Sequence, residues 1–177
     1  MSTTALILIL LVLVLAALLA YAAMRPADFR IARSTTIAAP PDKIFPLIDD
    51  FARWAAWSPY EKLDPNMKRS RSGPETGTGS AYSWEGNKKV GQGRMEIIET
   101  APPARLAIQL DFIKPFEARN RADFTLEPAG GGTKVTWTMT GKSPFMMRLM
   151  GLFMNMDRMI GKDFDTGLAS LKTLAEA

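Results

Sequence analysis

The hydrophobic and polar positions along the chain follow three patterns in succession. Residues 5–24 read ALILILLVLVLAALLAYAAM and include no charged residue. Between residues 29 and 141, short runs alternate apolar and polar positions, and Gly, Pro and Asn separate them. From Met156 to Ala175, apolar residues recur every three or four positions. The patterns predict an apolar helix, then β-strands, then an amphipathic helix.

The apolar run at 5–24 predicts a single transmembrane helix. A helix of this length, rising about 1.5 Å per residue, spans about 30 Å, which matches the hydrocarbon core of a bilayer. A cleaved secretory signal is the alternative, because AYA at 20–22 offers an A-x-A cleavage site. The run is longer than the roughly 7 to 15 apolar residues of a signal, and no Lys or Arg precedes it, so an anchor is favoured.

Three arginines follow the apolar run and bear on its orientation. Arg25, Arg30 and Arg33 lie just after it. By the positive-inside rule they place the following domain in the cytoplasm. Cleavage of a signal would instead make that domain secreted or periplasmic.

Seven runs predict the strands of an antiparallel sheet. They cover residues 29–37, 67–73, 79–84, 92–100, 105–113, 117–127 and 133–141. The clearest alternation is LAIQLDF at 106–112. Strict alternation indicates one covered face and one face in water, and the covering element is expected to be the helix that begins near Met156.

Two short helices are expected between the first two strands. Asp42 is a plausible N-cap for the first. Its apolar positions are Ile44, Phe45, Leu47 and Ile48. The second would hold Phe51, Trp54 and Trp57 on one face before Ser58-Pro59 stops it.

The order of elements and several local phrases resemble the SRPBCC or START-like superfamily, which includes polyketide cyclase/dehydrase and lipid-transfer types. The phrases are STTIAAPPDKIFPLIDDFARWAAWSP at 34–59, DP at 64–65, GTGSAYSWEG at 77–86, GQGRMEIIE at 91–99, GGTKVTWTM at 131–139 and DRMIGKDFDTGLASLK at 157–172. The resemblance implies an α+β helix-grip fold: a curved seven-stranded antiparallel sheet around a long C-terminal helix, with two short helices closing one end. Residues 1–26 would form the anchor and residues 27–177 the ligand-binding domain.

The resemblance also implies a cavity between sheet and helix for apolar or amphipathic molecules such as lipids, sterols or polyketides. Its expected lining combines the closed end, the apolar parity of each strand and one face of the helix. The candidate ligand-binding residues are Trp54, Trp57, Tyr82, Trp84, Met95, Ile97, Ile108, Leu110, Phe112, Asn120, Phe124, Trp137, Met139, Met156, Ile160 and Phe164. Asn120 is the lone amide among them and a candidate for holding a ligand's polar end. Packing of these side chains into a filled core is the competing interpretation.

The amino-acid composition limits the catalytic and metal-binding sites that the chain can form. The chain has no Cys and no His, which excludes Ser-His-Asp hydrolases, Cys-His proteases and the common zinc sites. We therefore expect no metal and no cofactor. The net charge is +4, with 22 Lys and Arg against 18 Asp and Glu. These basic residues form no continuous stripe, so no nucleic-acid partner is expected, and a membrane surface is the simpler partner.

Acid–base chemistry would have to come from charged residues in the strands. The candidates are Glu85, Glu96, Asp111, Glu117, Asp123, Arg94, Arg119 and Arg121. Most have the polar parity of their strands, which favours a solvated face over a catalytic pair, and no catalytic residue is assigned.

The sequence FMMRLMGLFMNM at 145–156, here called the Met-rich segment, has two interpretations. It is either a fully buried helix start or a pliable lid that contacts lipid, since Met adapts to varied apolar shapes. Three functions stay open for the whole chain. It is a membrane-tethered carrier, sensor or sequestering module for a hydrophobic molecule, a cyclase- or hydratase-type enzyme, or a protein-binding scaffold at the bilayer.

Overall fold

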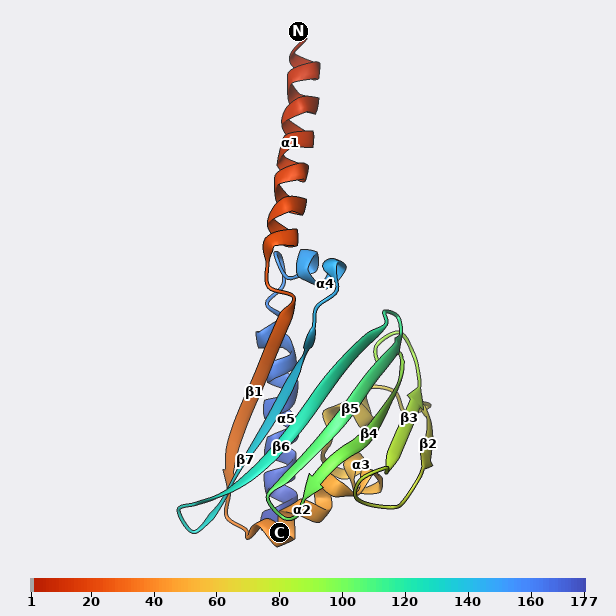
Figure 1. Cartoon of the computed structure of the whole chain (residues 1–177), viewed down its shortest axis with the longest axis vertical. Coiled ribbons are helices and arrows are strands. Elements are labelled where there is room, and N and C mark those ends of the chain that lie inside the picture. Colours follow the sequence, from red (N-terminus) through yellow and green to blue (C-terminus); the bar gives the residue numbers. More distant parts are fainter. Residues whose placement is uncertain (1) are drawn as a thin grey trace.

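The computed structural model describes residues 2–177 and shows a curved seven-stranded antiparallel sheet with one long helix on its inner face (Figure 1). The strand order is β1-β7-β6-β5-β4-β3-β2. The strands are β1 (Asp28–Ile37), β2 (Lys68–Ser72), β3 (Ala81–Glu85), β4 (Gln92–Ala101), β5 (Arg105–Lys114), β6 (Ala118–Ala129) and β7 (Gly132–Lys142). The helices are α1 (Thr3–Met24), α2 (Pro41–Asp49), η1 (Phe51–Arg53), α3 (Trp54–Trp57), η2 (Pro59–Lys62), α4 (Phe145–Met150) and α5 (Met156–Glu176). The predicted helix-grip fold class is confirmed.

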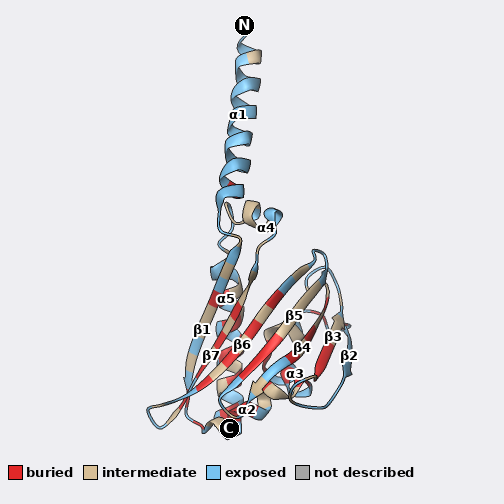
Figure 2. Ribbon diagram, in the orientation of Figure 1, coloured by how far each residue is buried: buried red, intermediate tan, exposed pale blue. Residues whose placement is uncertain are grey.

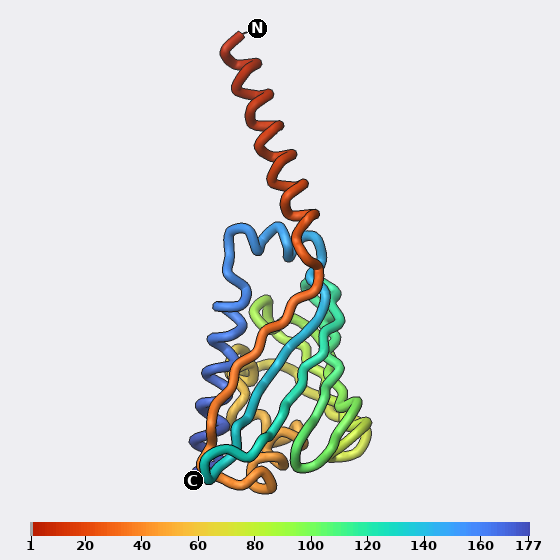
Figure 3. Tube along the Cα trace, turned by 60° about the vertical axis from the view of Figure 1, so that its left-hand side comes forward, coloured from red at the N-terminus to blue at the C-terminus, as the bar shows by residue number. Residues whose placement is uncertain are grey.

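α1 extends away from the rest of the molecule (Figures 1 and 3). It has 22 residues, of which Ala22 alone is buried, and its most apolar window has a mean hydropathy of 3.1. Its length and composition suit a membrane span, and a signal sequence near an N-terminus meets the same criteria.

The short helices α2 and α3 lie together at the end of the sheet far from α1, which we call the closed end (Figure 1). Trp54 and Trp57 are buried on one face of this unit, as predicted. The predicted N-cap at Asp42 is wrong. Pro40 occupies the N-cap position and Pro41 begins the helix, where the missing N–H of proline needs no acceptor. Asp42 lies in the first turn, where its charge still favours the helix dipole.

α5 lies along β1 and is fixed there by an arginine (Figure 3). Arg33 points from β1 to the helix, and its Nη2 lies 3.0 Å from Oδ2 of Asp157 while its Nε lies 3.5 Å from Oδ2 of Asp165. The guanidinium passes over Gly161, where a Cβ would collide with it. A glycine at 161 therefore lets the edge strand and the helix approach each other.

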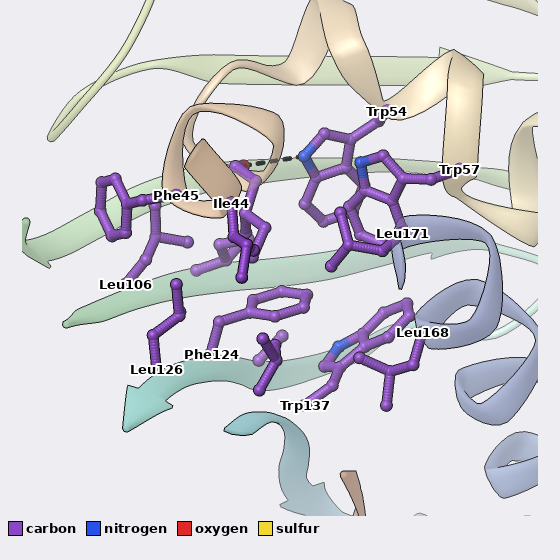
Figure 4. Close-up of a cluster of buried hydrophobic side chains, with 14 of the residues drawn as sticks. Ile44, Phe45, Trp54, Trp57, Leu106, Phe124, Leu126, Trp137, Leu168 and Leu171 are labelled. Atoms are coloured by element: carbon purple, nitrogen blue, oxygen red, sulfur yellow. Dashed lines mark hydrogen bonds between the residues drawn. The ribbon is translucent and has the colours of Figure 1, made fainter. Parts of the chain in front are cut away.

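The hydrophobic core occupies the closed half of the space between sheet and helix (Figures 2 and 4). Its largest fully buried side chains include Trp57, Phe124, Phe164, Leu168 and Leu171. Each stabilises the fold by about 1.5–3 kcal/mol through burial. These residues come from α3, β6 and α5, so the closed end joins all layers of the fold.

The Met-rich segment is not a buried helix start, which contradicts the first of its two interpretations. It forms α4 and a following turn, and a separate helix, α5, begins at Met156. None of the described residues 145–156 is buried. The segment connects β7 to α5 beside the end of α1 (Figure 2).

Candidate functional site

The closed half of the interior is filled by protein side chains. The ring of Trp137 stacks on that of Phe164 with centroids 4.0 Å apart and planes 5° apart. Nε1 of Trp54 donates to the carbonyl of Ile48 at 2.8 Å (Figure 4), and Nε1 of Trp57 donates to the carbonyl of Leu47 at 2.8 Å. Because backbone groups satisfy these two indoles, they act as the packed floor of the fold.

The half of the interior near α1, which we call the open half, is different. Several of its inward-facing side chains, from the sheet and from α5, stay only partly buried. They are Phe29 of β1, Trp84 of β3, Leu110 and Phe112 of β5, and Met156 and Ile160 of α5. Side chains that face inward but remain accessible indicate that sheet and helix do not meet here. The open half is therefore packed less completely than the closed half, and its partly buried side chains are apolar.

One row of cross-strand neighbours traverses the open half. It runs from β1 to β3 through Phe29, Gly141, Asn120, Leu110, Met95 and Tyr82. Asn120 is the only amide in the row and is 7% exposed. Its Oδ1 has no hydrogen-bond partner among residues 2–177. An unpaired buried polar atom costs about 1–3 kcal/mol, so this amide is an exception among the packed side chains of its row.

Gly141 shapes the space around this amide. A Cβ at 141 would collide with Oδ1 of Asn120 and would lie 3.1 Å from the ring of Phe29. Glycine at this position therefore leaves room for the amide between two strands. Beyond the Asn120–Gly141 pair, β6 separates from β7.

An open groove of about 1000 Å³ lies where the two strands separate. Its lining includes Phe29, Ala118, Gly141, Phe145 and Arg148. It therefore connects the row of Asn120 with α4 and the end of α1 (Figure 3).

The structure separates the candidate ligand-binding residues into two groups. Those in the filled half are Trp54, Trp57, Ile97, Ile108, Phe124, Trp137, Met139 and Phe164. Those around the open half are Tyr82, Trp84, Met95, Leu110, Phe112, Asn120, Met156 and Ile160, of which Tyr82, Met95 and Asn120 are buried. In the second group, Nε1 of Trp84 donates to the carbonyl of Val90 at 3.0 Å, and its ring lies over Gly93. In the first group, Nε1 of Trp137 lacks a partner within the described chain.

The acid–base candidates lie on the outer face of the sheet. Nη2 of Arg94 lies 2.6 Å from Oε2 of Glu96, Nε of Arg119 lies 2.9 Å from Oδ1 of Asp111, and Arg121 pairs with Asp123 at 3.1 Å. Glu85 and Glu117 are exposed. The ion pairs stabilise a solvated surface, whereas Glu117, which precedes β6, lines the open groove where β6 and β7 separate.

The sequence patterns did not identify one inward-facing carboxylate, that of Glu61 in η2. Its side chain is 8% exposed and accepts hydrogen bonds from the hydroxyl of Tyr82 and, at 2.8 Å, from Nε of Arg69. Burial and the Glu61 hydrogen bond raise the pKa of Tyr82. Charge alone could not reveal this site, because Glu61 lies outside the predicted elements and its partners come from β2 and β3.

The sequence patterns also gave no sign of a second pair of interacting residues, Tyr60 and Asp163. Burial raises the pKa of Tyr60, and the nearby Asp163 carboxylate raises it further. Burial also raises the pKa of Asp163 itself, although Lys162 and the Tyr60 hydroxyl oppose the shift. The ring of Tyr60 packs edge-on against Trp137, so this pair joins η2 to α5 at the filled half.

Comparison with known proteins identifies the fold's family. The family model described as "Polyketide cyclase / dehydrase and lipid transport" matches residues 28–176, which is nearly the whole chain after α1. The chain belongs to this family. Membership confirms the superfamily suspected from the sequence and indicates a helix-grip domain that binds a hydrophobic ligand. Among curated proteins, no sequence matches this chain significantly.

Solved structures show the same fold at low identity. Protein CV1439 from Chromobacterium violaceum is 16% identical, with a TM-score of 0.59 over 86% of this chain and 99% of that one. The Aha1 dimer from Colwellia psychrerythraea is 18% identical, with a TM-score of 0.59 over 84% and 96%. The di-domain ARO/CYC BexL from the BE-7585A biosynthetic pathway is 14% identical, with a TM-score of 0.62 over 88% and 52%. The chain therefore spans about half of BexL.

Proposed function

We propose that residues 27–177 form a binding domain for an amphipathic, largely apolar small molecule, and that residues 1–26 hold this domain at a membrane. The family supports a hydrophobic ligand. The domain would act as a carrier, a sensor or a sequestering protein. Arg25 and Arg30, both exposed beside the end of α1, favour a cytoplasmic location for the domain.

The observation that carries the proposal is the buried amide oxygen of Asn120, which lacks a protein partner in the described chain. It lies in the row of Phe29 and Leu110, and Ile160 of α5 adds another partly buried apolar side chain to the open half. A ligand with an apolar body and a hydroxyl or amine at one end would bury its body against these side chains. Its polar end would then donate a hydrogen bond to Asn120.

Replacing Asn120 by Leu tests this role. Leu keeps the size of the side chain and removes the polar oxygen. We expect the variant to bind its ligand about 3- to 10-fold more weakly, the effect of one lost hydrogen bond of about 0.5–1.5 kcal/mol. Its ligand-free stability should equal or exceed that of the wild type, because an unpaired buried oxygen has been removed.

The measurement is mass spectrometry of organic extracts from the purified full-length protein, combined with thermal unfolding after delipidation. Gln92→Leu is the matched control, since Gln92 is a half-exposed amide on the outer face of β4. Equal amounts of extracted ligand from Asn120→Leu and Gln92→Leu would contradict the proposal. So would a large loss of stability confined to Asn120→Leu, because it would show a structural role.

A cyclase-type reaction is not favoured by the geometry. The carboxylates predicted as acid–base candidates are exposed or lie in outer-face ion pairs. The inner carboxylate of Glu61 is held by Tyr82 and Arg69. Binding without proton transfer accounts for the open half with fewer assumptions.

A further inference from the structure

The Met-rich segment exposes an unusual amount of apolar surface at one end of the molecule. Phe153 is 76% exposed, and Phe145, Met146, Met150 and Met154 are exposed as well. Such a concentration of accessible large apolar side chains marks an interaction surface. α4, which contains Phe145, Met146 and Met150, lies beside the end of α1 (Figure 2), and Phe153 and Met154 follow it in the chain.

Two arginines join the Met-rich segment to the end of α1 by hydrogen bonds that run in both directions. We call these bonds the Arg25–Arg148 exchange. Nη1 of Arg148 donates to the carbonyls of Ala23 at 3.0 Å and Arg25 at 3.1 Å. Nη1 of Arg25 donates in return to the carbonyl of Gly151 at 3.1 Å. Carbonyls at a helix C-terminus are unpaired and carry partial negative charge. A guanidinium there donates the missing hydrogen bonds and supplies the opposite charge. The contact also buries Ala22 completely.

The exchange sets the depth of the segment if α1 spans a bilayer. A 22-residue helix is about 33 Å long, so its last turn emerges at the boundary between acyl chains and headgroups. The Met-rich segment is bonded to that turn and therefore lies at the same depth. Its exposed Phe and Met side chains suit the acyl boundary, and the exposed Arg25, Arg30 and Lys142 nearby suit anionic headgroups.

We propose that the Met-rich segment inserts into the interfacial layer of the same leaflet from which α1 emerges, held at that depth by the Arg25–Arg148 exchange. The occupant of this surface is thus lipid. The open half and its groove, lined in part by Phe145 and Arg148, then face the leaflet, and the ligand enters from the membrane. This inference rests on the membrane anchoring in the proposed function and adds the route to the site.

The absence of cysteine from the chain makes a direct test simple. Single-cysteine variants Met146→Cys, Phe153→Cys and Lys134→Cys carry an environment-sensitive fluorophore in the otherwise unchanged full-length protein. Lys134 is the matched control, because it is exposed on β7 toward the closed end. The proteins are reconstituted into phosphatidylcholine vesicles that contain phosphatidylglycerol, with or without nitroxide-labelled acyl chains.

We expect blue-shifted emission at 146 and 153 that nitroxide lipid quenches strongly, and neither effect at 134. Adding Arg148→Gln should reduce quenching at 153 while α1 stays inserted. Quenching at 146 and 153 no stronger than at 134 would overturn the inference. A blue shift without quenching would also overturn it, since it would indicate a protein partner or a second copy. Neither result would affect ligand loss in Asn120→Leu, so the two proposals fail separately.

Discussion

Two neighbouring residues, Asn120 and Gly141, depart from the apolar packing of the inner face of the sheet. Asn120 is buried without a partner in the described chain, which is costly unless a ligand pairs with it. Gly141 beside it leaves room for the amide oxygen, with which a Cβ would collide. Both lie on strands that otherwise bury apolar side chains inward. A sequence pattern marked Asn120 as an exception, and the structure adds that its oxygen is unsatisfied.

At this scale, Asp163 gives a pH-dependent prediction. Its pKa in the folded protein lies above its ordinary value of 3.8 because burial disfavours the charged carboxylate. A raised carboxyl pKa means that the folded state binds the proton more tightly than the unfolded state. Stability from this residue is therefore present below pH 3.8 and is lost as pH rises through the folded-state pKa.

Asn at position 163 cannot ionise, so the Asp163→Asn variant should not lose stability as pH rises through the folded-state pKa of Asp163. We expect it to melt at a higher temperature than the wild type at neutral pH, with the difference shrinking below pH 3.8. Circular dichroism of both proteins across this pH range measures the effect. A difference that grows toward acidic pH would show that the sign is wrong.

Among the elements, η2 has a larger role than its four residues suggest. Glu61 from η2 receives Tyr82 of β3 and Arg69 of β2, so one carboxylate joins the helical closed end to the edge of the sheet. Removing it leaves the buried hydroxyl of Tyr82 without its acceptor, while the guanidinium of Arg69 keeps its hydrogen bonds to the carbonyls of Met67 and Glu61.

We predict that Glu61→Ala lowers the free energy of unfolding by about 1–3 kcal/mol, the penalty for leaving buried polar groups unpaired. Glu75→Ala, at an exposed position, should change it by less than about 0.5 kcal/mol. Thermal unfolding of both full-length variants in the same detergent makes the comparison. Equal melting temperatures of the two variants would show that the Glu61 carboxylate does not stabilise the fold.

The strands and their inward parity could be predicted from sequence because alternation is a local property. Leu106, Ile108, Leu110 and Phe112 face inward as their spacing indicated. The same pattern could not tell that Ile108 is packed whereas Leu110 is half-exposed, since this depends on where α5 crosses the sheet. Glu61 was missed for the same reason: its partners lie 8 and 21 positions away.

At the scale of the whole molecule, the two ends of the grip differ in chemistry. The closed end is filled by indoles and by leucines of α5, while the open half faces α1 and the Met-rich segment (Figures 1 and 4). A membrane at the open end would place the open half next to a reservoir of amphipathic molecules. Under the proposed function, the groove and the exposed Phe153 would both serve exchange between bilayer and protein.

Native mass spectrometry of the full-length protein released from lipid nanodiscs tests this account most directly. The wild type should retain one bound amphipathic molecule. Ile160→Trp should lose it by filling the open half, and Thr166→Trp, at an exposed position of α5, should keep it. A wild type without a bound molecule, or an Ile160→Trp variant that retains one as well as the wild type does, would contradict binding in the open half.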